Sequence, residues 1–328
     1  MIHGGCVWET GNPADWLDFS ANIRPEGPPE WVVEALRSSI DDVRYYPDIN
    51  MRRARSGLSE YTGLPEECVL PTAGGEAAID LALSYRNGRV YTLETDFGEY
   101  TRRAAVHGRE QAKWPGKCGP GDTLILSNPG NPTGRVTSRE ELLALHEQLY
   151  RAGAELAVDE AFADYSPGCS LRREIRPGLI VIGSMTKILG IPGVRLGFLC
   201  AEPGMIRTLQ ERTLPWSLST QAARVAEELP KHTADICRDA EANAERREEL
   251  KKRLERLGAE VVPSGSNFLL ADFHRDMEES AATLKERGIL VRTCASFGLP
   301  GSFIRLAVRT EVENEELISS LEGILHAR

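Results

Sequence analysis

Three polar segments of the chain carry side chains that can bind a ligand or transfer a proton, and each directly follows a short apolar stretch. Asn131 lies in a run rich in Asn, Pro and Gly, Asp159 opens the sequence Asp-Glu-Ala-Phe, and Lys187 closes the sequence Gly-Ser-Met-Thr-Lys. Taken singly, each has an ordinary explanation: a turn for the first, a helix cap or surface acid for Asp159, and a solvated amine for Lys187. Their shared position behind apolar stretches favours a common site.

The elements that must position these residues alternate between short apolar strands and helical stretches. Strands are expected at 69–70, 89–93, 123–126, 155–158, 179–182 and 195–199. The clearest helix spans 139–152, with Ser138 as N-cap, Glu141 completing a capping box and Gly153 just past the end. Such alternation predicts a mainly parallel sheet covered on both faces. Because ligands bind outside the carboxyl ends of such strands, the three polar segments can line one crevice.

The sequence pattern changes near residue 220. The elements expected beyond it are a long charged helix at 234–257, an apparent β-α-β unit (strand 267–270, helix 278–287, strand 304–308) and a final helix at 313–325. The second half therefore reads as a small α+β domain attached to the first. The expected division is an N-terminal arm joining the small domain (1–25), a large domain (26–225) and a small C-terminal domain (226–328).

The composition limits the classes of function that the chain can have. Of its 328 residues, 41% are hydrophobic and 27% are charged, which is typical of a globular protein. The formal net charge of −10 argues against nucleic-acid binding, and it requires that an anionic ligand be held by locally placed cations. The seven cysteines form no C-x-x-C pair and no H-E-x-x-H occurs, so a metal site has no support.

The sequence also lacks the features that direct a chain to a membrane or out of the cell. The first residues, Met1 to Cys6, contain neither the basic nor the apolar stretch of a signal peptide. The longest apolar runs are far too short to span a membrane. Together with scattered thiols of odd number, these features predict a cytoplasmic protein with no membrane partner.

In their order along the chain, these motifs resemble those of fold-type-I pyridoxal-phosphate enzymes, the aspartate aminotransferase superfamily. Within it, the chain is similar over nearly its whole length to the branch that holds histidinol-phosphate aminotransferases and threonine-phosphate decarboxylases. The resemblance implies an α/β fold whose large domain has a mainly parallel seven-stranded sheet between helices, with a small α+β domain after it. It also implies pyridoxal 5'-phosphate as the cofactor.

The resemblance assigns four residues to the cofactor ring. Lys187 matches the Schiff-base lysine, whose amine becomes a nucleophile and proton carrier when its pKa is depressed. Asp159 matches the carboxylate that pairs with the pyridinium nitrogen. Asn131 matches the amide that donates to the ring O3′, and Phe97 matches the aromatic side chain that stacks on the ring.

A second group of residues is matched to the cofactor phosphate. Its members are Gly74, Gly75, Glu76, Ser184 and Arg195. The first three precede a helix expected at 77–84, whose backbone N–H groups and dipole form an anion site. The hydroxyl and the guanidinium would complete it. Taken alone, the two glycines would indicate no more than a tight turn.

The resemblance also implies a homodimer and a substrate site. Tyr46 is similar to the tyrosine that reaches the cofactor phosphate from the neighbouring subunit, although Tyr45 could take that role and either could belong to the core. Active sites shared between two subunits follow from it. Arg305 matches the small-domain arginine that forks onto the substrate carboxylate.

One departure from the aminotransferase pattern favours the decarboxylases. Many aminotransferases of this branch have Tyr three residues after the pyridinium aspartate, where this chain has Phe162, which leaves O3′ to Asn131 alone. Threonine-phosphate decarboxylases resemble the chain in that Phe and in the segments around His3 and Asn22. The resemblance implies that His3 and Asn22 meet the substrate phosphate, with Arg292 as a further candidate; the alternative for His3 is a disordered terminus.

These residues predict decarboxylation of an O-phospho amino acid, L-threonine O-3-phosphate or a close relative, in cobalamin side-chain synthesis. The alternative is an aminotransferase of the histidinol-phosphate type acting on an amino-acid and keto-acid pair, since the same lysine, aspartate and arginines serve both reactions. A sensor of this fold without turnover and a nicotinamide-dependent dehydrogenase are less favoured. No winged-helix domain precedes the enzyme-like region, and no G-x-G-x-x-G follows a strand.

Overall fold

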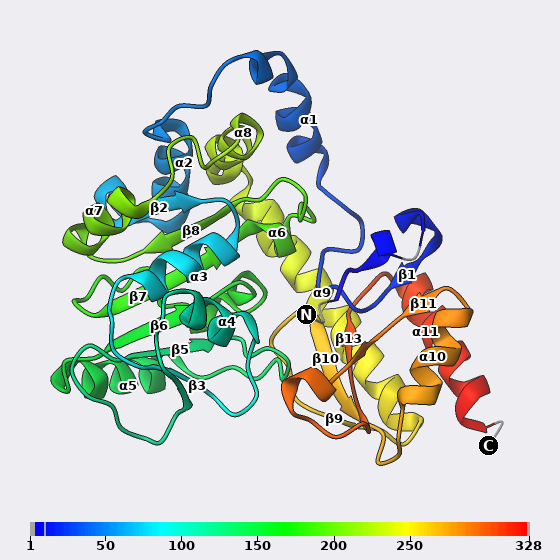
Figure 1. The fold of residues 1–328 in the computed structure, drawn as a ribbon. Coiled ribbons are helices and arrows are strands. Elements are labelled where there is room, and N and C mark those ends of the chain that lie inside the picture. Colours follow the sequence, from blue (N-terminus) through cyan, green and yellow to red (C-terminus); the bar gives the residue numbers. More distant parts are fainter. Residues whose placement is uncertain (1–3, 10, 327–328) are drawn as a thin grey trace.

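The computed structural model describes residues 4–9 and 11–326 of the chain. A larger body is built on one wide sheet, and a smaller body lies beside it (Figure 1). The long helix α9 (Thr233–Arg256), yellow in Figure 1, passes from the larger body into the smaller one. Apolar side chains gather in two main cores, one around the wide sheet and one in the smaller body.

The wide sheet has seven strands in the order β2-β8-β7-β6-β5-β3-β4. The strands are β2 (Val69–Thr72), β3 (Val90–Thr92), β4 (Gln111–Lys113), β5 (Thr123–Ser127), β6 (Glu155–Asp159), β7 (Leu179–Ser184) and β8 (Gly197–Cys200). Only β8 runs antiparallel to its neighbours, so the predicted mainly parallel seven-stranded sheet is confirmed. Strand β4 was not expected, because it is a polar edge strand without an apolar run.

The central strands are buried along their whole length, as in a sheet that is covered on both faces. The helices of this body are α1 (Glu30–Ser38), α2 (Arg52–Thr62), α3 (Gly75–Ser84), α4 (Glu99–Val106), α5 (Arg139–Arg151), α6 (Met185–Ile188), α7 (Pro203–Arg212) and α8 (Thr220–Glu228). The capping box expected at the start of α5 is present, with Ser138 Oγ accepting from the Glu141 backbone N–H.

The smaller body contains a four-stranded sheet in the order β12-β13-β10-β9. Its elements are β9 (Glu260–Val261), β10 (Phe268–Asp272), α10 (Glu278–Glu286), β11 (Ile289–Leu290), β12 (Arg292–Thr293), β13 (Phe303–Ala307) and α11 (Glu311–His326). The expected β-α-β unit would make β10 and β13 parallel, but they pair antiparallel, so this expectation is wrong. The short strands β11 and β12 intervene, and the chain reverses between β12 and β13, which pair antiparallel.

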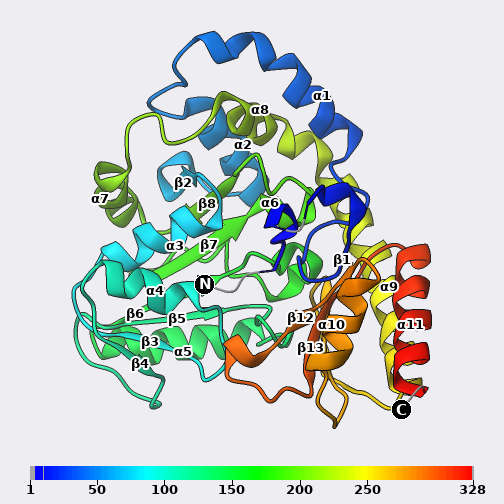
Figure 2. The same cartoon turned by 45° about the vertical axis from the view of Figure 1, so that its right-hand side comes forward.

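The N-terminal segment is tied to the smaller body. Strand β1 (Leu17–Asp18) pairs in parallel with β11, and the Ala307 backbone N–H donates to the Phe19 carbonyl at 2.9 Å. In Figures 1 and 2 this blue segment lies at the junction of the two bodies, close to α6. Among the helices of residues 4–9 and 11–326, none is both long and apolar enough to cross a membrane.

Candidate active site

A cavity of about 750 Å³ lies where the two bodies and the N-terminal segment meet. Of the residues predicted from the sequence, it brings together Asn22, Phe97, Asn131, Asp159, Lys187, Arg292 and Arg305. These residues come from the N-terminal arm, four segments of the large sheet and two strands of the small one. A single cavity therefore collects side chains that are far apart in the sequence.

The register of the parallel strands explains why three of these residues meet. Ser127 at the end of β5 is the partner of Asp159 at the end of β6, and Asp159 is in turn the partner of Ile182 in β7. Helix α6, which carries Lys187, begins directly after β7. The carboxyl ends of adjacent parallel strands open on one edge, as the sequence predicted.

Lys187 has an amine adapted to chemistry near neutral pH. Burial lowers the pKa of Lys187 to about 8, and the positive charges of Arg305 and Arg195 act in the same direction. The carboxylate of Asp159 opposes the shift. A larger share of neutral amine, which is the nucleophilic form, follows from this environment.

Asp159 is a buried carboxyl group with two hydrogen-bond donors. The hydroxyl of Tyr100 donates to Oδ2 at 2.7 Å, and the backbone N–H of Ala161 donates to Oδ1 at 3.0 Å. Burial raises the pKa of Asp159, while these two hydrogen bonds and Lys187 lower it. No lysine or arginine of the described residues forms an ion pair with it, so it is ready to pair with a cationic ring nitrogen.

Sequence reasoning missed the role of Tyr100. Its side chain is fully buried, and its ring packs edge-on against Phe97 with centroids 5.6 Å apart. The only available signal was its place three residues after Phe97, on the same side of the helix start. In the structure this tyrosine links the aromatic wall of the cavity to Asp159.

The residues matched to the phosphate gather at the N-terminus of α3. A Cβ on Gly74 would lie 2.6 Å from Arg195 Nη2, and one on Gly75 would lie 3.2 Å from the Ser184 Cβ. Gly74 also has a φ of 83°, which side chains other than glycine rarely adopt. A second cavity of about 450 Å³, lined by Arg195, adjoins the first through Gly193. The N-terminus of α3, with its backbone N–H groups and its dipole, therefore lies against the Arg195 guanidinium beside this cavity.

The side chain of Glu76 serves a different purpose from its backbone. Its carboxylate accepts a hydrogen bond from Arg102 at 3.2 Å. Burial and the neighbouring Glu99 raise the pKa of Glu76 to about 7. An acidic side chain held in this way leaves the backbone N–H of Glu76 as the group that can face an anion.

Two buried arginines stand side by side on the small-domain wall. Arg292 in β12 and Arg305 in β13 are direct partners in the antiparallel register. Both guanidinium groups lie over the ring of Phe297, at 5.3 and 5.8 Å from its centroid. Arg305 also donates to Asn131 Oδ1 at 2.7 Å and to the Ser20 carbonyl at 2.7 Å. Sequence reasoning named both arginines but not their adjacency.

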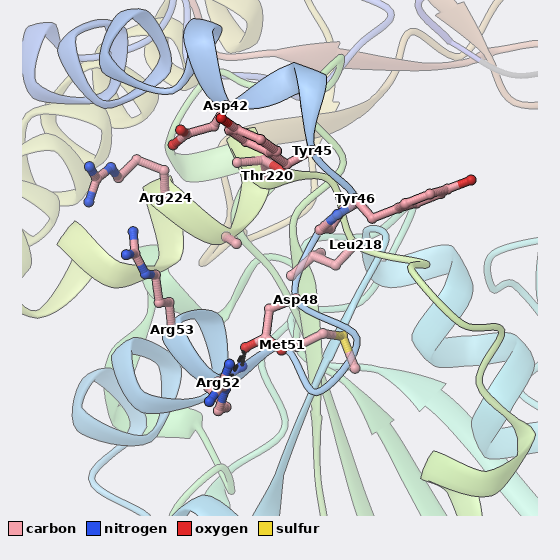
Figure 3. A pocket seen from close by; sticks show the side chains of 12 residues that line it. Asp42, Tyr45, Tyr46, Asp48, Met51, Arg52, Arg53, Leu218, Thr220 and Arg224 are labelled. Atoms are coloured by element: carbon pink, nitrogen blue, oxygen red, sulfur yellow. Dashed lines mark hydrogen bonds and ion pairs between the residues drawn. The ribbon is translucent and has the colours of Figure 1, made fainter.

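The remaining predicted residues have distinct positions. Asn22 is buried in the cavity wall, and its Oδ1 atom has no hydrogen-bond partner among the described residues. Phe162 packs edge-on against Phe268 and also lines the cavity. His3 lies outside the described residues. Tyr46 is 81% exposed and lies in a separate surface pocket, where Figure 3 shows its side chain pointing away from the other lining residues.

The residues present fit the cofactor that the resemblance implies. A buried carboxylate without a cationic partner suits a ring nitrogen, and the cavity lined by Ala73 and Arg195 suits a phosphate. Lys187 feels the charges of both groups, because Asp159 raises its pKa and Arg195 lowers it. Unpartnered buried atoms of Asn22 and Arg305 (Nε) leave polar groups of the cavity free for a substrate.

Comparison with known proteins agrees with this geometry. The model of the family "Aminotransferase class I and II" matches residues 14–321. A threonine-phosphate decarboxylase of Salmonella typhimurium is 29% identical over 98% of this chain and 96% of its own length. A histidinol-phosphate aminotransferase of Moorella thermoacetica is 28% identical over 95% of this chain and 86% of its own length. The crystal structure of a histidinol-phosphate aminotransferase from Clostridium acetobutylicum superimposes with a TM-score of 0.87 at 24% identity, covering 94% of this chain and 99% of that one.

Proposed function

The chain belongs to the class I and II aminotransferase family, and from this premise we propose that it is a pyridoxal-phosphate-dependent decarboxylase of an O-phospho amino acid. The proposed substrate is L-threonine O-3-phosphate or a close relative, and the product is aminopropanol phosphate for the cobalamin side chain. The threonine-phosphate decarboxylase of Salmonella typhimurium, similar along nearly the whole chain, supports this choice.

The observation that carries the proposal is the pair formed by Arg292 and Arg305. The two residues are partners in the strand register, and both side chains are buried in one wall of the cavity. Burial lowers the pKa of Arg305 to about 10, with repulsion by Arg292 acting in the same direction, yet both remain cations at neutral pH. Two adjacent cations in a chain of net charge −10 suit a compact substrate that carries a phosphate and a carboxylate a few atoms apart.

Pyridoxal phosphate supplies a ring that accepts the electron pair released at the substrate Cα. Asp159 would hold the ring nitrogen in its cationic form, while Phe97 and Asn131 would fix the ring plane. Gly74, Gly75, Ser184 and Arg195 would hold the phosphate, with the backbone N–H of Glu76. Lys187 would anchor the cofactor, and its amine would then move a proton at the substrate Cα.

The small-domain wall would decide which substrate bond breaks. The bond perpendicular to the ring is the one whose electrons enter it. In this proposal Arg305 binds the carboxylate, and Arg292 and Asn22, with His3, bind the phosphate. A substrate held at both ends would be unable to rotate, so the Cα–carboxylate bond stays perpendicular to the ring.

A comparison of two substrates tests this function. Incubation of the holoenzyme with L-threonine O-3-phosphate is expected to give aminopropanol phosphate and CO2 in equal amounts. The second candidate function is histidinol-phosphate transamination, favoured by the similarity to the enzyme of Moorella thermoacetica. Glutamate formed from histidinol phosphate and 2-oxoglutarate, without release of CO2, would establish that function instead.

The lowered pKa of Lys187 predicts how cofactor uptake depends on pH. Only the neutral amine reacts, so the rate of pyridoxal phosphate uptake by the apoprotein should rise with pH and level off above about 8. A lysine with the ordinary value of 10.5 would give a rate that still climbs about tenfold per pH unit near pH 9. Stopped-flow absorbance distinguishes the two profiles, and continued climbing would show that the amine is not perturbed.

Replacement of Gly74 by alanine should weaken cofactor binding. The new Cβ would sit 2.6 Å from Arg195 Nη2 in a backbone conformation with φ of 83°, so the guanidinium has to move away from the phosphate. The dissociation constant for pyridoxal phosphate should rise by about ten- to a hundredfold. Gly168→Ala is the matched control, because its Cβ would meet nothing within 4 Å. Equal dissociation constants for both variants would count against the phosphate site.

We further propose that two copies of the chain form a homodimer with shared active sites. Exposed apolar side chains lie on the segment between α1 and α2 and on the segment between α7 and α8, which meet at Tyr46 and Trp216, and we take them as one candidate surface. It consists of Ile40, Val43, Tyr45, Tyr46, Ile49, Leu214 and Trp216. The rings of Tyr46 and Trp216 lie 4.9 Å apart, and Tyr45 lies near Thr220 and Asp42 in Figure 3. A patch of this kind on a chain of ordinary composition favours association, with Tyr46 reaching the partner's phosphate site.

A charge in this surface is expected to separate the dimer. Val43→Glu places a carboxylate where Val43 is 61% exposed in the single chain and would be covered in the dimer. Sedimentation equilibrium should then show a monomer that binds pyridoxal phosphate poorly. Val312→Glu, at an exposed valine of α11, should remain dimeric. If the wild-type chain itself sediments as a monomer, the shared-site proposal is wrong.

The cysteines, which indicated a cytoplasmic protein in the sequence, give the same indication in the structure. All seven cysteines are free thiols in the structure, which is typical of a reducing environment. We therefore place the enzyme in the cytoplasm. Localisation of the tagged chain by cell fractionation tests this assignment.

A further inference from the structure

The carboxyl group of Asp96 has no part in the roles assigned above, although it lies next to the proposed ring site. Its Oδ1 atom accepts hydrogen bonds from the Phe97 backbone N–H at 2.9 Å and from Ser127 Oγ at 2.7 Å. Its Oδ2 atom is buried and has no partner among the described residues. Such a half-satisfied acid is costly to bury, so its presence calls for a physical reason.

The contacts of Asp96 reach three of the residues proposed to touch the ring. Phe97 is held through its own backbone N–H. Asn131 is held through Ser127, whose Oγ accepts from the Asn131 backbone N–H at 2.8 Å. Asp159 is the strand partner of Ser127, and its negative charge acts on Asp96. One carboxyl group thereby connects the stacking residue, the O3′ donor and the partner of the ring nitrogen.

The surroundings of Asp96 also determine its charge. Burial raises the pKa of Asp96 to about 7; the hydrogen bonds from Ser127 and Phe97 act against the shift, and the charge of Asp159 acts with it. The titratable groups that face it are Asp159 and Tyr100, and burial keeps the pKa of Tyr100 far too high for it to ionise. No lysine or arginine of the described residues forms an ion pair with Asp96.

We propose that Asp96 is a positioning residue that fixes Phe97, Asn131 and Asp159 for the cofactor ring and whose charge acts on the ring through Asp159. Below neutral pH Asp96 is neutral and adds no charge beside Asp159. Above neutral pH Asp96 ionises and places a second negative charge beside Asp159, which strengthens the hold on a cationic ring nitrogen. The part of this proposal that concerns the ring rests on the proposed cofactor site.

Asp96→Asn tests the charge without removing the hydrogen-bond acceptor. The amide Oδ1 can still accept from Ser127 and Phe97, and the variant is neutral at every pH. Its dissociation constant for pyridoxal phosphate should equal that of the wild type near pH 5.5. Near pH 8.5 it should be about three- to tenfold larger than that of the wild type. Asp122→Asn is the matched control, since Asp122 accepts two backbone N–H groups at the opposite end of β5. The control should follow the wild-type profile.

Thermal unfolding of the apoprotein gives a readout that needs no cofactor. In the native state Asp96 keeps its proton to a higher pH than its ordinary pKa of 3.8 allows in the unfolded chain. The contribution of Asp96 to wild-type stability is therefore full at low pH and is lost as the pH rises toward about 7. The unfolding temperature of Asp96→Asn relative to wild type should therefore increase from about pH 4 to about pH 7 and then stay constant. Other raised carboxyl groups, such as Glu160, contribute equally to both proteins and cancel.

Two results would overturn the proposal. The first is a constant difference in unfolding temperature across the pH range, which shows that Asp96 holds no proton. The second is a parallel pH dependence of cofactor binding in wild type and Asp96→Asn despite the expected unfolding result, which separates Asp96 from the ring site. If Asp96→Asn does not fold, Ser127→Ala is the deciding variant. It removes a hydrogen-bond donor to the ionised Asp96 carboxylate, so the pH at which stability falls should be higher than in the wild type. An unchanged pH for this fall in stability contradicts the proposal.

Discussion

Replacement of Lys187 by alanine is expected to lower kcat by at least about 10⁴-fold, because the variant loses both the anchoring amine and the proton carrier at Cα. The backbone of Lys187 belongs to the short helix α6 and its carbonyl accepts from the Arg24 backbone N–H, so the substitution leaves the local fold in place. Steady-state kinetics with L-threonine O-3-phosphate measure the loss. Mass spectrometry after borohydride treatment should show cofactor mass on the wild-type chain and none on the variant.

The control for this variant is another lysine outside the cavity. Lys231 is largely exposed and pairs with Glu228 at 2.7 Å, so Lys231→Ala should keep wild-type kinetics. A Lys187→Ala enzyme within about tenfold of wild-type kcat would mean that another group performs the chemistry. A borohydride-stable cofactor mass on a different lysine would identify that group.

Asp159→Asn is expected to lower kcat by about 10³-fold, because it replaces the negative charge beside the ring nitrogen by a neutral dipole. Removing one partner of a buried ion pair costs about 3–5 kcal/mol, which corresponds to a loss of this size. The amide oxygen can still accept from the Ala161 backbone N–H, and the amide NH2 group can donate to the Tyr100 hydroxyl oxygen, so packing around β6 stays the same. KM should change far less than kcat, because Asp159 acts on the ring and not on the substrate anions. Initial-rate kinetics over a range of substrate concentrations separate the two parameters.

Asp122→Asn serves again as the control, because it changes the same residue type at the distant end of the same sheet. Its kcat should remain within about twofold of wild type. If Asp159→Asn shows the same small effect, the ring nitrogen does not depend on this carboxylate. A drop of equal size in both variants would instead point to damaged folding.

The larger body was predictable because its signals are local and strong. The strands that end at Ser127, Asp159 and Ser184 are fully buried apolar runs, and their common parallel direction brings their polar ends together. Phe97, Asn131, Asp159 and Lys187, all named from the sequence, accordingly line one cavity. The polar edge strand β4 has no such run, and only its pairing with β3 reveals it.

The parts that the sequence did not reveal depend on contacts between distant residues. Antiparallel pairing of β10 with β13 follows from the two short strands between them, which no periodicity marks. The adjacency of Arg292 and Arg305 is a consequence of that register. The bond from Tyr100 to Asp159 spans 59 residues, and a fully buried tyrosine looks in sequence like any other core aromatic.

The site therefore combines a scaffold that short-range patterns specify with a substrate wall that only the tertiary structure specifies. Asp159 and Lys187 belong to the first group, since each directly follows its strand. Arg292 and Arg305 belong to the second, and in the proposed function the choice of substrate depends on them. This division explains why the family was easier to predict than the reaction.

The most direct test of the proposed reaction follows the substrate carboxyl carbon through a single turnover. L-threonine O-3-phosphate labelled with carbon-13 in its carboxyl group is mixed with excess holoenzyme, and the products are analysed by NMR and mass spectrometry. We expect all of the label in CO2 and all of the nitrogen in aminopropanol phosphate. Label retained in a 2-oxo acid, with the nitrogen left on the cofactor, would show that the enzyme transfers the amino group and would contradict decarboxylation.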